Sequence, residues 1–290
     1  MARTFPPLEF SYGSREAIIY ALCAGMGQDP LDRRELDFVY EPRLKLLPTL
    51  LTAAAWDYRF IEGSGIDEVM ILHGAQRVTV HAPLPPAATV VNRFRIADIF
   101  DKGPGRGAVV VAETELREKA SGRLLCTHLW TSYARGEGGF GGPRGLSEPP
   151  VTVPHREPDA VVAAATTTSS STLYRLLGDV NPLHVDPDVA IAAGFPRPIL
   201  HGLCTYAIVS RAIVAAACGY APERLAMLDC RFLAPAFPGD SIDTEMWVDT
   251  GTATFRATAR ERGVELARGT ARLADSAPPP AVSAAAMTPA

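Results

Sequence analysis

The chain has 290 residues, of which 47% are apolar and only 21% are charged, so it can bury a substantial hydrophobic core in one large domain or two small ones. Its formal net charge of -4 at pH 7 gives no general attraction to phosphate backbones, which argues against nucleic acid as a partner. The composition is typical of a soluble globular protein.

The sequence gives little indication of a targeting segment or of disulfide bonds. The N-terminal sequence MARTFPPLEF lacks a long apolar region behind a basic start, and the most apolar later run, residues 203–218, contains Arg211. We therefore expect neither a signal peptide nor a membrane span. The five cysteines are odd in number and scattered, which indicates reduced thiols packed in a core and argues against disulfides or a metal site. The expected location is cytoplasmic.

The first half of the chain predicts one helix followed by a run of strands. Ser14 is a candidate N-cap for a helix from Arg15 to about Met26, because a serine hydroxyl satisfies free amides at a helix start. Its apolar face would comprise Ile18, Ile19, Leu22 and Cys23. Strand patterns follow at residues 75–81, 89–100, 107–118 and 123–133, with Gly- and Pro-containing turns between them. A meander of long antiparallel strands is the simplest arrangement.

A segment rich in Gly and Pro, residues 136–158, divides the chain near its middle. It lacks apolar periodicity, so it is interpreted as a linker. We expect an N-terminal domain over residues 1–135, a C-terminal domain over residues 159–275, and a disordered tail over residues 276–290.

The second half repeats the plan of the first. A helix is predicted from about Gly202 to Cys218, and strands are predicted at residues 225–233, 241–249, 252–261 and 264–273. Short strings also match, since His73-Gly74 resembles His201-Gly202 and the sequence from His81 loosely resembles the sequence from Leu233. We interpret the chain as a diverged duplication of α+β class, in which each half wraps an antiparallel sheet around one long apolar helix.

The segment between the linker and the second helix carries the candidate chemistry. In Gly178-Asp179-Val180-Asn181-Pro182-Leu183-His184, a structured turn holds Asp179 and His184 five residues apart. A carboxyl group and an imidazole that converge on one point can act as acid and base near neutral pH. Asp186-Pro187 then predicts an N-cap and first residue of a short helix to Gly194.

The second helix supplies a possible oxyanion donor. The Gly202 amide would be among the free N–H groups at the positive end of the helix dipole, and glycine lets a ligand approach closely. Acid, base and oxyanion donor together favour addition or elimination next to an activated carbonyl. A covalent hydrolase is disfavoured because the sequence has no Gly-x-Ser-x-Gly elbow.

The motif from Tyr174 to Gly202, with its Asp-x-Asn-Pro-x-His element and its Pro198-Ile199-Leu200-His201-Gly202 end, resembles the hydratase segment of the MaoC-like, type 2 enoyl-CoA hydratases. Tyr12, Arg15 and Tyr40-Glu41-Pro42 resemble the opening of the same family. The resemblance covers most of residues 10–273 and implies a double hot-dog fold. Leu177 departs from the pattern, since the family has a small hydroxyl residue before Gly-Asp.

The resemblance implies syn hydration of a trans-2-enoyl-CoA to the (3R)-3-hydroxyacyl-CoA, without metal or redox cofactor. Asp179 and His184 would hold the water, and which of them is the base stays open. Asn181 would orient this dyad, and the Gly202 amide would bind the thioester oxygen.

Further residues are expected to contact the acyl-CoA by the same resemblance. They are His73, Gly74, Lys102, Val180, Pro182, Leu183 and Phe232. The first half lacks the Asp-x-Asn-Pro-x-His element, so it would form the acyl tunnel, and the protein is expected to be a homodimer active in fatty acid metabolism such as beta-oxidation.

Two other functions stay open. One is a 3-hydroxyacyl-thioester dehydratase in acyl-chain synthesis, and the other is a catalytically silent acyl-CoA-binding module. Simpler structural interpretations also exist for single residues: Asp179 and Asn181 as turn formers, His201 as a support for its helix start, and Lys102 as a solvated lysine.

Overall fold

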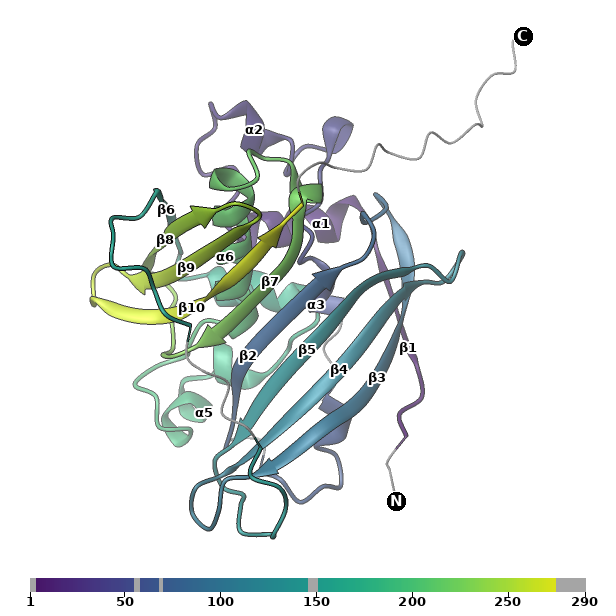
Figure 1. Ribbon diagram of the computed structural model, residues 1–290, viewed down its shortest axis with the longest axis vertical. Coiled ribbons are helices and arrows are strands. Elements are labelled where there is room, and N and C mark those ends of the chain that lie inside the picture. The colour runs from purple at the N-terminus through teal and green to yellow at the C-terminus, as the bar shows by residue number, and fades with distance from the viewer. Residues whose placement is uncertain (1–3, 55–57, 68–69, 146–150, 275–290) are drawn as a thin grey trace.

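A single antiparallel sheet of ten strands forms the body of the protein (Figure 1). The computed structural model describes residues 4–54, 58–67, 70–145 and 151–274, so the predicted C-terminal tail lies outside the described residues. The strand order is β1-β3-β4-β5-β2-β7-β10-β9-β8-β6. The helices lie behind the sheet in Figure 1, and its other face is turned to the viewer.

The bounds of the elements are as follows. The strands are β1 (Leu8–Tyr12), β2 (Ile71–Val80), β3 (Ala88–Asp101), β4 (Ala108–Glu118), β5 (Leu124–Ala134), β6 (Ala160–Ala165), β7 (Leu225–Phe232), β8 (Ser241–Asp249), β9 (Thr252–Ala259) and β10 (Val264–Leu273). The α-helices are α1 (Ser14–Cys23), α2 (Arg33–Leu36), α3 (Leu51–Ala54), α4 (Ser170–Tyr174), α5 (Pro187–Ala192) and α6 (Gly202–Ala216). Short 3-10 helices are η1 (Glu41–Arg43), η2 (Tyr58–Phe60), η4 (Arg175–Leu177), η5 (Pro182–His184) and η6 (Pro222–Arg224).

The strand order is that of a duplication. Read outward from the centre, β2, β5, β4, β3 and β1 on one side correspond to β7, β10, β9, β8 and β6 on the other. The turn after β2 and the turn after β7 even share a hydrogen-bond pattern: two successive amides, from His81 and Ala82, donate to the Leu125 carbonyl, as those of Leu233 and Ala234 do to Leu266. The predicted match between these two strings is therefore confirmed, since they occupy equivalent positions in the two halves of the fold.

The other predicted match is wrong. His73 and Gly74 lie in β2, at a register shift against β5, whereas His201 is the N-cap of α6 and Gly202 is its first residue. The two His-Gly strings therefore occupy different places in the repeat. A dipeptide is too short to specify position without the surrounding pattern.

The expected separation into two sheets also needs correction. β2 pairs with β7 in antiparallel register from Ala75 opposite Arg231 to Thr79 opposite Met227, and this pairing joins the two halves into one sheet. An edge strand left unpaired exposes backbone donors and acceptors. Pairing the innermost strand of each half satisfies those groups and leaves β1 and β6 as the edges.

All eight predicted strands are present, but both edge strands were missed. β1 and β6 have only five and six residues, and β6 is AVVAAA, so neither shows a long alternation. The first helix starts one residue earlier than predicted, with Gly13 as the N-cap, and the Glu16 carboxylate accepts the Gly13 amide at 2.9 Å.

The predicted apolar face of α1 is only partly confirmed, since Cys23 is buried and Ile19 packs against the core. Its buried residues are Ala17, Tyr20, Ala21 and Cys23, and Leu22 is 45% exposed. The helix packs against α4 and α6, and small side chains allow such a close approach between helices. The α6 helix itself is central, because every residue from 203 to 214 is buried.

The two halves are tied together through α6. Arg211 of α6 donates two hydrogen bonds to the Glu35 carboxylate and a third to the Ala163 carbonyl. Thr49 donates to the Ser210 hydroxyl at 2.8 Å. Both side chains of the Arg211–Glu35 ion pair are almost fully buried, so each charge depends on the other for compensation.

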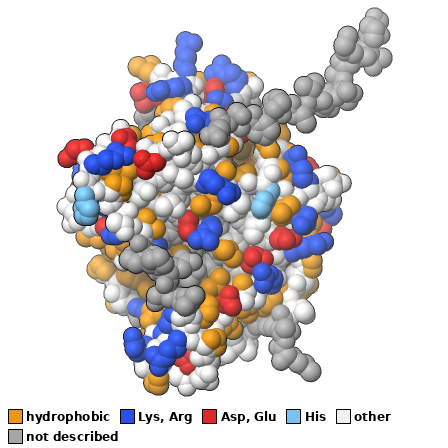
Figure 2. Space-filling view, viewed as in Figure 1, with side chains coloured by type: hydrophobic (Ala, Val, Ile, Leu, Met, Phe, Trp, Pro, Cys, Tyr) orange, Lys and Arg blue, Asp and Glu red, His pale blue; other side chains and the backbone are white. Residues whose placement is uncertain are grey.

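The helix-free face of the sheet carries paired charges among apolar side chains (Figure 2). Arg77 of β2 pairs with Asp229 of β7 across the central seam, and Arg95 of β3 pairs with Glu113 of β4. Val78, which follows Arg77, is fully buried on the opposite face, as the alternation of side chains along a strand requires.

Part of the predicted linker is tightly held. The Asp101 carboxylate at the end of β3 accepts the amides of Gly103, Gly139 and Gly141 at 2.7 to 2.8 Å. These hydrogen bonds keep the pKa of Asp101 below its ordinary value. Glycine suits this loop because Gly139 and Gly141 both have positive φ.

The cysteine prediction is confirmed, since all five cysteines are buried free thiols. Among the described residues, none of the helices has the length and hydropathy needed to cross a bilayer.

Candidate active site

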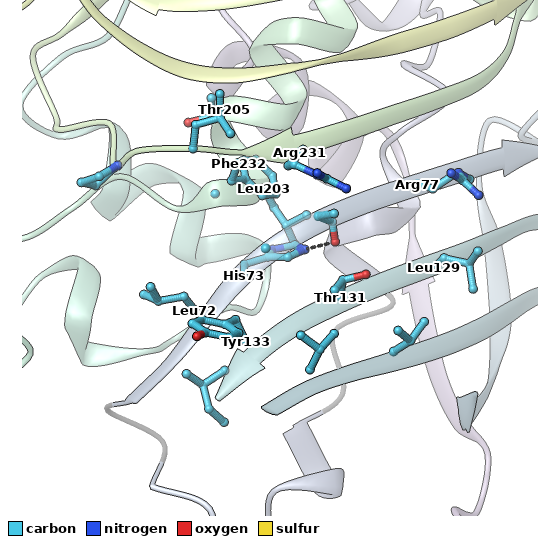
Figure 3. Close-up of a pocket in the computed structure, with 18 of the residues that line it drawn as sticks. Leu72, His73, Arg77, Leu129, Thr131, Tyr133, Leu203, Thr205, Arg231 and Phe232 are labelled. Carbon is cyan, nitrogen blue, oxygen red and sulfur yellow. Dashed lines mark hydrogen bonds between the residues drawn. The ribbon is translucent and has the colours of Figure 1, made fainter. Parts of the chain in front are cut away.

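A cavity of about 1480 Å³ opens beside the central seam of the sheet and is lined by both halves of the chain. Figure 3 shows its side chains coming from β2, β5, β7 and the start of α6, with His73 near the centre. Asp179, His184 and Gly202 line the same cavity. The structure thus brings most of the predicted site residues together.

The loop that carries Asp179 is built by its own side chains. Gly178 has a φ of 121°, which an L-residue rarely adopts. Asp179 then accepts the Asn181 amide at 3.2 Å, and Asn181 accepts the Leu183 amide at 3.0 Å. Two successive Asx turns therefore lead into η5, which ends at His184.

His184 is held in one tautomer. Its Nδ1 lies 2.9 Å from the Ile199 carbonyl oxygen, so Nδ1 carries the proton and donates, and Nε2 is left as an acceptor. Desolvation lowers the pKa of His184 to about 4. The imidazole is accordingly neutral at physiological pH and able to accept a proton.

Asp179 has the opposite shift. Its side chain lies in a buried setting, with the whole residue only 7% exposed, and desolvation raises its pKa to about 6. The hydrogen bond from the Asn181 amide and the nearby Arg175 charge oppose this rise without cancelling it. A buried carboxyl poised near neutrality beside a neutral imidazole is a pattern of acid–base sites.

The third member of the cluster is His201. Asp179, His184 and His201 each offer one atom that could bind a metal ion, and these three atoms lie within 4.8 Å of one another. The two imidazoles stack at 3.7 Å between centroids with 26° between planes. Nitrogen lone pairs lie in the ring plane, so the lone pairs of two stacked rings lie in separate, nearly parallel planes and do not converge readily on one point. This arrangement suits stacking better than shared coordination of one metal ion.

Gly202 begins α6 next to the cluster, and as the first helical residue it has no carbonyl one turn earlier to accept its amide proton. A side chain in its place would first meet His73 Nδ1 and Phe232 Cζ, each at 3.7 Å. The start of α6 therefore lies between the two halves, with His73 from the first half and Phe232 from the second as neighbours of Gly202.

His73 lies at the register shift of β2. Its Nε2 donates to the Ala75 carbonyl at 3.0 Å, the contact drawn in Figure 3, and its ring packs against Trp130 and Phe232 at 5.4 and 4.8 Å between centroids. Desolvation lowers the pKa of His73 to about 3. His73 is therefore uncharged at neutral pH and forms part of the cavity lining.

The remaining predicted site residues differ in whether they line the cavity. Gly74, Leu183 and Lys102 line the cavity, and Lys102 Nζ donates to the Arg144 carbonyl at 2.8 Å. Val180 and Pro182 are exposed and are not among the described residues that line the cavity. Asn181 does not line it either, and acts on the site through its turn.

Sequence reasoning missed two contributors. Ile199 orients His184 through a backbone carbonyl, which no side-chain pattern reveals. Arg144 lines the cavity near Lys102; its position as a cation in the glycine-rich linker was the available signal.

Comparison with known proteins gives two family matches. Residues 150–269 match the MaoC like domain, and residues 10–136 match the MFE-2 hydratase 2 N-terminal domain. Enoyl-CoA hydratase ChsH3 of Mycobacterium tuberculosis is 43% identical over 250 residues, covering 84% of this chain and 86% of that protein. The peroxisomal enoyl-CoA hydratase 2 of Arabidopsis thaliana is 36% identical over 290 residues, covering 93% and 92%.

Solved structures agree on the fold. A MaoC-like dehydratase from Phytophthora capsici has a TM-score of 0.80 at 29% identity, over 92% of this chain and 94% of that one. A Mycobacterium tuberculosis protein described as a double hotdog fold has a TM-score of 0.56 at 15% identity, over 94% and 95%. The fold is therefore of the hot-dog type.

Proposed function

Because the chain belongs to the MaoC-like, type 2 enoyl-CoA hydratase family, we propose that it is a hydro-lyase that hydrates trans-2-enoyl-CoA to (3R)-3-hydroxyacyl-CoA. The observation that carries the proposal is the convergence of Asp179 and His184 beside the Gly202 amide, in one cavity large enough for a thioester. In this reaction the water oxygen bonds to C3 and a proton is added to C2, while the thioester oxygen carries the transient negative charge.

The roles of the dyad follow from its protonation. We assign His184 Nε2 as the base that takes a proton from water, and Asp179 as the acid that protonates C2. The acid's pKa, about 6, lies above the base's, about 4, so both groups hold the required forms together between these values. With the roles exchanged, the required pair would be the minor form of the dyad at every pH.

This assignment predicts the direction of the pH profile. As pH rises through about 6, Asp179 ionises and can no longer donate, so kcat/KM falls. With the roles exchanged, the required pair of ionised Asp179 and protonated His184 would give the same bell-shaped dependence on pH. A kcat/KM profile from pH 4.5 to 8 on one enoyl-CoA tests whether this pair limits the reaction, and a kcat/KM that stays level or rises through pH 6 would contradict the acid–base pair.

The substrate contacts are proposed as follows. The Gly202 amide binds the thioester oxygen, His73 and Phe232 form the walls around the reacting carbons, and Lys102 contacts a CoA phosphate near Arg144. Lys102→Ala should then raise KM for enoyl-CoA several-fold with little effect on kcat, because a phosphate contact is made equally in ground and transition states. An unchanged KM would remove Lys102 from the binding site.

The reverse reaction is the second candidate. A 3-hydroxyacyl-thioester dehydratase uses the same groups in the opposite order, and the Phytophthora relative is named a dehydratase. Measuring turnover in both directions, with CoA and carrier-protein thioesters, identifies the preferred direction and carrier.

The main test is loss of the enoyl-thioester absorbance when purified protein is mixed with crotonyl-CoA and longer 2-enoyl-CoAs. Asp179→Asn and His184→Ala should each lower kcat by at least about a thousandfold, since each removes an acid or base and disturbs its partner. Asp186→Asn and His155→Ala, which change exposed residues of the same types, are matched controls and should retain activity.

The outcomes separate the candidate functions. Tight binding of enoyl-CoA without turnover in the parent protein would favour a silent binding module and contradict the proposal. Near-normal kcat in Asp179→Asn or His184→Ala would remove that residue from the mechanism. Chiral analysis of the product tests the (3R) configuration.

Several finer points are also proposals. The reaction needs no metal or redox cofactor, so activity should survive dialysis against EDTA. The protein is a homodimer, which light scattering after gel filtration would test. It acts in the cytoplasm on fatty acyl chains, with the first half of the chain forming the acyl tunnel; a fluorescent fusion in its own cells tests the location.

A further inference from the structure

His201 contacts both members of the dyad. Its ring stacks on the His184 imidazole at 3.7 Å, and its Nε2 lies 3.3 Å from the Asp179 carbonyl oxygen. A carbonyl can only accept, so Nε2 carries the proton and donates. The ring also packs near Tyr174, at 4.8 Å between centroids.

The other ring nitrogen has no such partner. His201 Nδ1 is buried, with no hydrogen-bond partner in the described part of the chain, and the whole residue is 1% exposed. Leaving a buried polar atom unpaired is costly, so packing alone would favour a phenylalanine or leucine at this position. The imidazole is retained at a cost, which indicates that its N–H donor is needed.

The donor is not needed to cap the helix. His201 is the N-cap residue of α6, yet its side chain makes no capping hydrogen bond. The donor is directed to the Asp179 main chain, 22 residues earlier. Asp179 is thereby fixed at two points, its carbonyl by His201 and its carboxylate by the Asn181 amide.

His184 is likewise fixed at two points. Its edge is held by the Ile199 carbonyl, and its face rests on His201. Residues Ile199 to His201 therefore orient both groups, and the Leu200 amide between them is anchored to the Ala236 carbonyl at 2.8 Å. Residues 199–201, which immediately precede α6, thus fix the positions of Asp179 and His184 earlier in the same motif.

We propose that His201 is a positioning residue for the hydration reaction, holding Asp179 by a hydrogen bond and His184 by ring stacking. This inference rests on the proposed function of the site. His201 must stay neutral for this role, because a cation stacked on His184 would oppose protonation of that base. Burial and the neighbouring His184 keep the pKa of His201 far below neutrality, at about 2.

The two contacts can be separated by substitution. His201→Phe keeps a ring for stacking and removes the donor, whereas His201→Gln places an amide N–H near Nε2 and removes the ring. Each should lower kcat about tenfold, the order expected for one lost contact in a preorganised site, and His201→Ala about a hundredfold. KM should change less than about threefold, because the variants leave the Gly202 amide in place.

The pH profile provides a signature that a purely structural role would not produce. When His201 no longer packs on His184, water reaches the imidazole and its kinetic pKa rises from about 4 toward its ordinary value of 6.5. The low-pH limb of kcat/KM should therefore move to higher pH in His201→Gln and move less in His201→Phe, which retains the stack.

His128→Phe is the matched control. His128 is also a buried neutral histidine, 2% exposed, but it lies in β5 and does not line the cavity. The His128→Phe variant should keep the parent kcat per folded molecule even where its stability is lower, with folded fractions taken from circular dichroism.

The outcomes are distinct. An active parent whose His201→Phe and His201→Gln variants keep kcat within about twofold, with an unmoved low-pH limb, overturns this inference alone. A parent without turnover overturns the proposed function, and this inference with it. If His201→Phe does not fold, His201→Gln measured on its folded fraction decides between the remaining outcomes.

Discussion

Asp179→Asn should stabilise the protein while it abolishes turnover. Burial raises the pKa of Asp179 from 3.8 to about 6, which at about 1.4 kcal/mol per pH unit corresponds to about 3 kcal/mol. This energy is the cost of holding the ionised carboxylate in the folded state above pH 6. Asparagine has nearly the same shape, can still accept the Asn181 amide, and carries no charge.

The sign and pH window follow from linkage. The folded state binds the Asp179 proton more tightly than the unfolded state, so this group lowers stability fully above about pH 6 and not at all below about pH 4. The unfolding free energy of Asp179→Asn should exceed that of the parent by about 1 to 3 kcal/mol at pH 7.5. The difference should shrink as pH falls to 4.

Urea unfolding at several pH values measures this difference. Asp186→Asn is the control, because Asp186 is an exposed N-cap residue of α5 and asparagine is an equally good N-cap; its effect should stay within about 0.5 kcal/mol at every pH. Equal or lower stability of Asp179→Asn at pH 7.5, or a difference that does not depend on pH, would refute the reasoning.

Three further substitutions test other features. Gly202→Ala should leave stability unchanged, because the new methyl group meets only ordinary contacts at 3.7 Å, but should lower kcat at least about tenfold by blocking approach to the amide; a normal kcat would exclude this oxyanion site. Glu35→Gln should cost about 3 to 5 kcal/mol in urea unfolding, because Arg211 keeps a buried charge, and a loss below 1 kcal/mol would contradict that. Gly269→Ala should cost more than about 3 kcal/mol, since the added carbon would lie 1.9 Å from the Asp229 carbonyl oxygen; normal thermal stability would show that the strands can separate there.

Much of the fold was predictable because its strands are long. β4 and β5 alternate buried and half-buried residues over most of their 11 positions, which gives a clear period of two. The helix α6 was predictable from its continuous apolar run. β1 and β6 were not, because they are short and depend on pairing with β3 and β8.

The site was predictable where side chains act within one local motif. Asp179, Asn181 and His184 lie in successive turns whose residue types specify them. The contact between His201 and the Asp179 carbonyl spans 22 residues and involves a main-chain atom, so no pattern of side chains could indicate it. The pairing of β2 with β7 was hidden for a similar reason, since strand partners are chosen by the tertiary fold.

That central pairing has a consequence for how the molecule unfolds. The chain is double in its sequence plan, but Arg77 and Asp229 bridge the seam and Arg211 of α6 is bonded to Glu35 in the first half. If one half unfolded, the other half would be left with an unpaired strand edge and with a buried charge that has lost its partner. Duplication has therefore produced one cooperative unit, in which loss of tertiary structure and loss of the cavity should occur in a single transition.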